Sequence, residues 1–167
     1  MGERFLRPYA RRSRAHNVIL VNGCDQLAPE IEAVAPLTHA AVTDVYDFAL
    51  GTFDRGFDPN PTTADDRTRR TVRPKFPVRH HRAVLYLRGR GWIVIDHLAG
   101  EGRHEITPLW HFHPACTVKT DGMTVETTDE DMGNLHIRPI GKTDWQVTVI
   151  RGQEEPELQG WYSVTYG

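Results

Sequence analysis

Two apolar runs joined by a short glycine-containing turn constrain the fold of this chain more than any other feature. The runs cover residues 82–87 and 92–98, and Arg88-Gly89-Arg90-Gly91 connects them. Runs of this length, rich in β-branched and aromatic residues and bounded by glycine, predict a β-hairpin. Both runs are apolar nearly throughout, so we expect the hairpin to lie inside a sandwich or to be covered on both faces.

Strand signals recur along the rest of the chain, separated at short spacing by Gly, Asp, Asn or Pro. This pattern is typical of an all-β sandwich. Helical periodicity is nearly absent, and only a short helix over residues 29–35 is indicated. Residues 57–77 lack periodicity and predict a long, irregular, exposed loop. The further strands that we predict cover residues 42–50, 104–113, 117–119, 123–127, 135–139, 145–150 and 161–166.

The length of 167 residues fits a single domain with its own hydrophobic core. We therefore predict an all-β fold, an antiparallel two-sheet β-sandwich over residues 1–167, with the irregular loop near residues 57–77. No stretch approaches the roughly 18 apolar residues of a membrane span. Cys24 and Cys116 are too far apart in sequence for a zinc knuckle or a redox dithiol.

Positive charge is concentrated in two arginine-rich segments, residues 4–14 and 67–82, although the net charge is only −2. The arginine fork matches carboxylates and sulfates bidentately, so these segments suit an anionic partner. A solvated surface is the simpler interpretation. Nucleic acid is disfavoured as a partner, because acidic residues outnumber basic ones and no aromatic residues are interleaved with the basic ones.

The chain contains nine histidines, of which three are candidate metal ligands. His16 precedes the apolar run at residues 18–21, which the turn signal Asn22-Gly23 closes. A single histidine is more often a hydrogen-bonded structural residue than a ligand. His111 and His113 would share one face of a strand and could form half of a metal site. The simpler alternative is one exposed histidine at the strand tip and one that is hydrogen-bonded.

Other polar residues of the hairpin have structural explanations. Asp96 is expected to pair with Arg82 or His81 across the ladder. His80 and His81 point to opposite faces if extended, which argues against a shared metal. No nucleophile elbow or phosphate-binding loop occurs. Core packing is the expected role of the four tryptophans, Trp92, Trp110, Trp145 and Trp161.

Five motifs, taken in order, resemble the heparinase II/III family over nearly the whole chain. The resemblance implies the β-sheet region that follows the helical toroid in these polysaccharide lyases. The motifs are Arg14-Ala15-His16-Asn17 with the run to Gly23, His81-Arg82-Ala83-Val84-Leu85-Tyr86, Trp92-Ile93-Val94-Ile95-Asp96, Trp110-His111-Phe112-His113-Pro114 and Gly160-Trp161-Tyr162-Ser163.

The resemblance implies a parent enzyme that cleaves acidic polysaccharides of the heparin, heparan sulfate or alginate type by β-elimination. In the family, the catalytic asparagine, tyrosine and histidine lie mostly in the toroid and in an upstream strand. The family's zinc site combines an upstream histidine, an upstream aspartate and the histidine of the His-Asn motif, here His16. The resemblance also suggests a periplasmic or secreted location in bacteria.

We therefore expect this chain to be part of a longer lyase, without the N-terminal α/α toroid, and to be inactive and without tightly bound zinc on its own. Arg12, Arg14 and Asn17, which flank His16, are candidate substrate-binding residues. Exposed sheet edges favour homo-oligomers. Two alternatives stay open: a non-catalytic module that binds anionic glycans through its arginines, and a cupin-like metal enzyme that uses His111 and His113.

Overall fold

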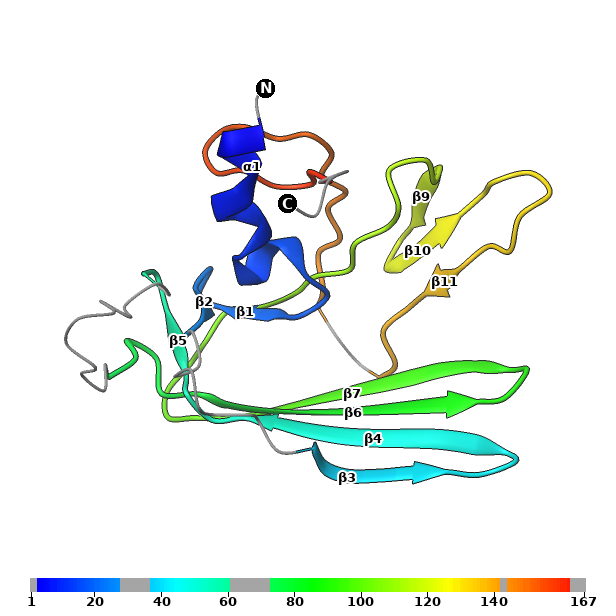
Figure 1. Cartoon of the computed structure of the whole chain (residues 1–167), viewed down its shortest axis with the longest axis horizontal. Coiled ribbons are helices and arrows are strands. Elements are labelled where there is room, and N and C mark those ends of the chain that lie inside the picture. Colours follow the sequence, from blue (N-terminus) through cyan, green and yellow to red (C-terminus); the bar gives the residue numbers. More distant parts are fainter. Residues whose placement is uncertain (1–2, 28–36, 61–72, 142–143, 163–167) are drawn as a thin grey trace. The chain divides into compact units, whose positions relative to one another are not determined.

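The computed structural model describes residues 3–27, 37–60, 73–141 and 144–162, and its regular structure is almost entirely antiparallel strand (Figure 1). The chain divides into two compact units. The central unit is Val18–Leu109, and the terminal unit combines Met1–Asn17 with Trp110–Gly167. The predicted all-β, antiparallel class is confirmed, in the form of several small sheets. The prediction of a single domain stays a prediction.

A four-stranded antiparallel sheet dominates the central unit. Its order is β3 (Leu37–Val42), β4 (Tyr46–Phe53), β6 (Arg79–Leu87) and β7 (Gly91–Ala99). Strands β6 and β7 are the predicted hairpin, which is confirmed, and they pair from Arg79 opposite Ala99 to Leu87 opposite Gly91.

The strand predicted over residues 42–50 is confirmed in part as β4, which begins only at Tyr46 because the chain turns back at residues 43–45. Thr43 makes this turn: its hydroxyl accepts hydrogen bonds from the backbone N–H groups of Val45, at 3.2 Å, and Tyr46, at 2.9 Å. A threonine side chain that bonds to the backbone two or three residues ahead promotes a turn without glycine or proline. Strands β3 and β4 therefore form a second hairpin around it.

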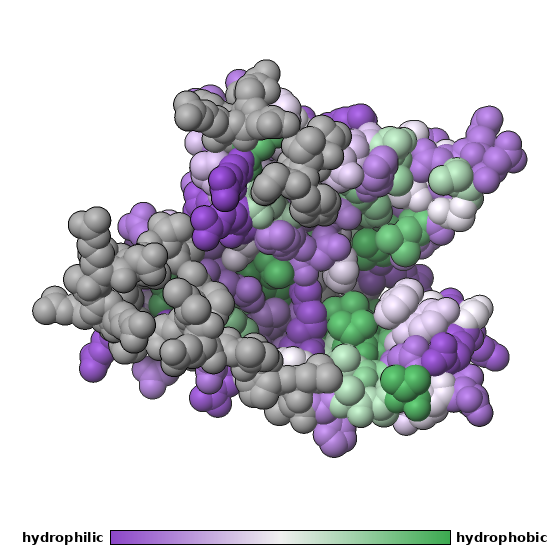
Figure 2. Space-filling view, viewed as in Figure 1, coloured by the Kyte–Doolittle hydropathy of each residue, from purple (hydrophilic) through white to green (hydrophobic). Residues whose placement is uncertain are grey.

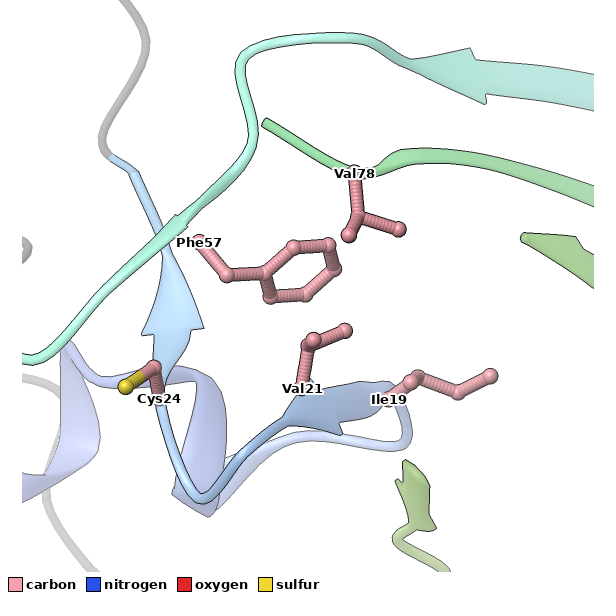
Figure 3. Packing of buried hydrophobic residues seen from close by; sticks show 5 residues of the cluster. All are labelled: Ile19, Val21, Cys24, Phe57 and Val78. Atoms are coloured by element: carbon pink, nitrogen blue, oxygen red, sulfur yellow. The ribbon is translucent and has the colours of Figure 1, made fainter. Parts of the chain in front are cut away.

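The core of the central unit gathers residues from two small sheets and from the segment just before β6 (Figure 3). Strand β1 (Ile19–Val21) pairs with β8 (Ile106–Pro108), and β2 (Asp25–Gln26) pairs with β5 (Phe57–Asp58). The ring of Phe57 is fully buried and points toward two valines. The buried cluster consists of Ile19, Val21, Cys24, Phe57 and Val78.

Phe57 also corrects the prediction of a loop exposed from residue 57 to residue 77. The strand β5 begins at Phe57, and its backbone N–H and C=O both bond to Phe76, at 2.8 and 3.0 Å. Both ends of the predicted loop are therefore tied into the core. Residues 61–72, together with the predicted helix at 29–35, lie outside the described residues.

Gly56, just before β5, is a position where the fold requires glycine. Its φ is +78°, and a Cβ atom would lie 2.6 Å from the Phe76 carbonyl oxygen. Gly89 has a similar φ of +70°, but nothing lies within 4 Å of its Cβ position. Alanine at Gly89 would thus meet backbone strain alone, whereas alanine at Gly56 would meet the same strain and a steric clash.

We expect Gly89→Ala to lower the free energy of unfolding by about 1 kcal/mol through its left-handed backbone alone. Gly56→Ala should cost about 3 kcal/mol, because the added methyl group also forces Phe76 out of place. Urea unfolding of both variants measures the difference. Equal losses of unfolding free energy in the two variants would show that residues 74–76 can move away without cost, and that they are not packed into the core.

The sheet strands are apolar on both faces, and the four-stranded sheet extends beyond the core. Trp92 and Ile95 lie on opposite faces of β7, and they are 62% and 58% exposed. The expectation that the hairpin is covered on both faces is therefore wrong for these positions. Apolar residues are visible at the surface over this sheet (Figure 2). Trp92 stacks on Tyr86 with ring centroids 4.3 Å apart, which gives it a partner outside the core.

The terminal unit begins with a helix, α1 (Glu3–Ala10), that the sequence did not predict. Tyr9 is buried and Leu6 is half-buried, whereas Arg7 and Pro8 are exposed, so one face packs inward. A 3₁₀ turn, η1 (Ser13–Ala15), follows. No helix among the described residues is long and apolar enough to span a membrane.

The second half of the terminal unit holds a three-stranded sheet of β9 (Val118–Asp121), β10 (Thr124–Thr127) and β11 (His136–Ile137). These strands confirm three predicted elements, with shifted ends.

Other predicted strands are wrong or shorter. Only β8 forms within residues 104–113, residues 145–150 form no strand, and neither do residues 161–162. The rest of the last predicted strand lies outside the described residues. Core packing is also wrong for Trp110 and Trp145, which are 39% and 37% exposed.

Candidate functional site

Backbone hydrogen bonds between residues 9 and 16 fix the segment that connects α1 to His16. The Arg12 N–H bonds to the Tyr9 carbonyl at 2.9 Å, and the Ala15 N–H bonds to the Arg12 carbonyl at 3.1 Å. The His16 N–H then bonds to the Ser13 carbonyl at 3.0 Å, which closes the 3₁₀ turn. Consecutive turns of this kind fix where His16 and Asn17 leave the helix.

The imidazole of His16 is oriented by the end of α1. Its Nε2 lies 3.0 Å from the Ala10 carbonyl oxygen. A carbonyl can only accept a hydrogen bond, so Nε2 carries the proton and Nδ1 keeps its lone pair. Metal-binding histidines typically have their other ring nitrogen held in this way. Nδ1 of His16, an exposed residue, is therefore the nitrogen available to a metal.

Asn17 joins this turn to His111, ninety-four positions further along the chain. Its Oδ1 accepts a hydrogen bond from the His111 backbone N–H at 2.6 Å. This carboxamide oxygen is thus engaged within the protein. The contact places Asn17, predicted to bind substrate, in a structural role and brings His111 to the neighbourhood of His16.

His111 lies in a half-buried position. Both ring nitrogens are buried and have no hydrogen-bond partner within the described structure. Burial lowers the pKa of His111, and the nearby charge of His16 lowers it further. The Arg14 carbonyl opposes both effects, although its contact with the ring lacks the geometry of a hydrogen bond. A neutral imidazole with buried nitrogens can act as a metal ligand.

Arg14 connects the N-terminal turn to the last described segment. Its guanidinium forms an ion pair with Glu157 at 2.7 Å, and its carbonyl accepts a hydrogen bond from the Gln159 amide at 3.0 Å. A substrate carboxylate would have to compete with Glu157 for Arg14. Arg12 contributes its backbone to the turn, and it lies half-buried beside this network.

His113 does not join His111. Neither residue lies in a strand, so the alternation that would place both imidazoles on one face is absent. His113 is exposed, its Nδ1 accepts a hydrogen bond from the Ala115 N–H at 3.2 Å, and its ring meets Tyr162 edge-on at 5.5 Å. The strand that motivated a cupin-like pair is therefore wrong, and a role of either histidine in metal binding stays a prediction.

The arrangement offers two imidazoles on adjacent segments, with Nδ1 of His16 and the nitrogens of His111 as donors. Nitrogen donors of this type suit zinc, which takes three or four protein ligands. The described residues contain no group of three or more potential metal ligands. A zinc site at His16 therefore stays a prediction.

Residues 157–159 were missed as parts of this site. The polar run around Glu157 and Gln159 carries no periodicity or motif, so no signal in the sequence connects it to Arg14.

The described fold is that of an antiparallel β-sheet protein with a histidine-bearing turn after α1. The model of the family described as Heparinase II/III-like, C-terminal, matches residues 2–167, so the chain belongs to this family. Comparison with curated proteins and with solved structures gives no match. The predicted resemblance is thus confirmed over the whole matched range.

Proposed function

We propose that this chain is the β-sheet region of a polysaccharide lyase that cleaves uronate-containing acidic polysaccharides, and that it is not catalytic alone. The family match over residues 2–167 carries this proposal. The arginines of the described N-terminal segment and the His16 turn are consistent with a surface that faces an anionic chain.

The reaction removes the proton on the carbon next to the uronate carboxylate and breaks the bond from the adjacent C4 to the linking oxygen. A C4–C5 double bond forms, and the departing sugar oxygen takes up a proton. This chemistry needs a base, an acid and neutralisation of the carboxylate charge. The resemblance places most of these groups in a helical toroid, and this chain would supply the wall against which that domain holds its substrate.

His16 is the proposed contribution of this chain to a zinc site. Its Ala10 contact holds the ring, and Nδ1 is the donor. His111, whose backbone N–H bonds to the neighbouring Asn17, is the proposed second nitrogen ligand. Zinc bound there would add fixed positive charge near the substrate, and the remaining donors would come from the upstream domain of the parent.

An absorbance assay tests the proposal. The purified chain, incubated with heparin, heparan sulfate or alginate, should give no rise in ultraviolet absorbance from unsaturated uronate. The same chain joined to its toroid should give one with a preferred substrate, and His16→Ala in that protein should lower its zinc content, with His113→Ala as the control. Turnover by the chain alone would overturn the claim of inactivity.

A heparin column distinguishes the binding-module alternative. Retention that weakens with salt, without turnover in any form of the protein, would favour a glycan-binding module, because screening weakens arginine contacts. If the joined protein neither degrades nor binds any of the three polysaccharides, the proposed function is wrong.

A further inference from the structure

A second pair of histidines lies on the four-stranded sheet, in the central unit. His81 in β6 and His97 in β7 are directly opposite each other across the ladder. Residues opposite each other on antiparallel strands project their side chains to the same face. Their ring centroids are 5.8 Å apart with an interplanar angle of 35°. His97 is exposed, and His81 is half-buried, so the pair opens to the surface.

We propose that His81 and His97 bind a divalent transition metal ion of the kind that prefers imidazole, such as zinc, nickel or copper. A zinc ion about 2.0–2.1 Å from one nitrogen of each ring sets the two centroids about 5 to 6 Å apart. The observed separation of 5.8 Å matches this range without movement of the backbone. Water molecules complete the coordination on the exposed side.

Thr52 acts as a positioning residue for this pair. It lies opposite His81 in β4, and its Oγ1 is 2.9 Å from Nδ1 of His81. When the hydroxyl accepts from Nδ1–H, Nε2 of His81 keeps the lone pair that a metal requires. A hydrogen bond on the far nitrogen also fixes the ring orientation, as in many metal sites. Packing of the two imidazole rings against each other would not require the Thr52 hydroxyl.

His80, next to His81 in sequence, is not part of the proposed metal site. His80 is 4% exposed and donates from Nε2 to Asp96 at 2.7 Å. Successive residues of a strand point to opposite faces, so His80 and His81 lie on different faces of the sheet. The His80 imidazole is already engaged by Asp96. His81 and His97 have no such carboxylate partner within the described residues.

Isothermal titration of the purified chain with zinc chloride and with nickel chloride tests the proposal. His81→Gln and His97→Gln should each weaken one metal-binding event at least about tenfold, because each removes a ligand. Thr52→Val keeps both ligands and should weaken the same event by roughly tenfold through loss of orientation. His136→Gln, which changes a 66%-exposed histidine in the terminal unit, is the matched control.

His16→Gln separates this site from the proposed lyase site. If the metal-binding event survives His16→Gln and is lost in His97→Gln, the sheet site is supported whatever the enzymatic assays give. If it survives His97→Gln, the inference is wrong. Thermal unfolding of each metal-free variant checks that the exposed His97 substitution leaves the fold unchanged.

Discussion

Replacing Phe57 with alanine is expected to lower the free energy of unfolding by about 4 kcal/mol, which is enough to unfold a marginal domain. Phe57 is 0% exposed, and it lies at the centre of the cluster formed by the small sheets. Its ring meets Phe53 edge-on at 5.8 Å, so the variant also loses an aromatic pair. Alanine would leave a cavity that several rigid strands line and that cannot collapse easily. Urea unfolding followed by circular dichroism measures the loss.

A matched pair of valines tests whether burial causes this effect. Val78 is 2% exposed and belongs to the same cluster, whereas Val42 is 80% exposed at the end of β3. Val78→Ala should cost about 2 kcal/mol, from two methylene equivalents and the space they leave. Val42→Ala should cost about 0.5 kcal/mol or less. Similar losses at both valines would contradict the position of the core.

The long hairpin was predictable down to its register, because a glycine-containing turn separates two apolar runs of similar length. Pairing outward from that turn places Arg82 opposite Asp96 and His81 opposite His97, as the structure has them. The pairing of Asp96 with Arg82 was predicted, and it is confirmed. The same counting would have located the second histidine pair. The turn at Thr43 was missed because a side-chain hydroxyl makes it, without glycine or proline.

The site around His16 was only half predictable. The His-Asn motif marks one side of it, but the contact from Asn17 to His111 spans ninety-four positions and follows no periodicity. His111 was paired with His113 on the assumption of a strand, and its environment depends instead on Arg14 and His16. A local sequence motif can indicate that His16 is a candidate ligand. Which residue lies beside it depends on tertiary packing, which the motif does not indicate.

A partly buried ionic network lies on the face of the sheet opposite the histidine pair. Asp96 accepts from Arg82 Nε at 2.6 Å and from its terminal nitrogen at 3.0 Å, and His80 Nε2 donates to the same carboxylate at 2.7 Å. Burial raises the pKa of Asp96, but the hydrogen bonds and charges of His80 and Arg82 outweigh it and hold the pKa below its ordinary value of 3.8. Three donors on one carboxylate also fix β6 against β7.

Asp96→Asn is expected to cost about 4 kcal/mol of unfolding free energy, because it removes the carboxylate charge that pairs with Arg82 in a poorly solvated place. The side chains of Asp96 and Arg82 are only 18% and 21% exposed. The same substitution at Asp47 is the control. Asp47 pairs with Arg88 at the surface, with side chains 34% and 42% exposed. Exposed pairs contribute little, so Asp47→Asn should cost about 0.5 kcal/mol.

Acid unfolding gives the second readout for Asp96. Because its pKa is lowered by folding, its contribution to stability is complete above about pH 5 and is lost as the pH falls below 3.8 through the folded value. The difference in stability between the wild-type chain and Asp96→Asn should therefore be largest near neutral pH and should shrink toward pH 3. Thermal unfolding across this range measures it. A difference that stays constant with pH would mean that the carboxylate charge does not hold this network, and that the variant acts through packing alone.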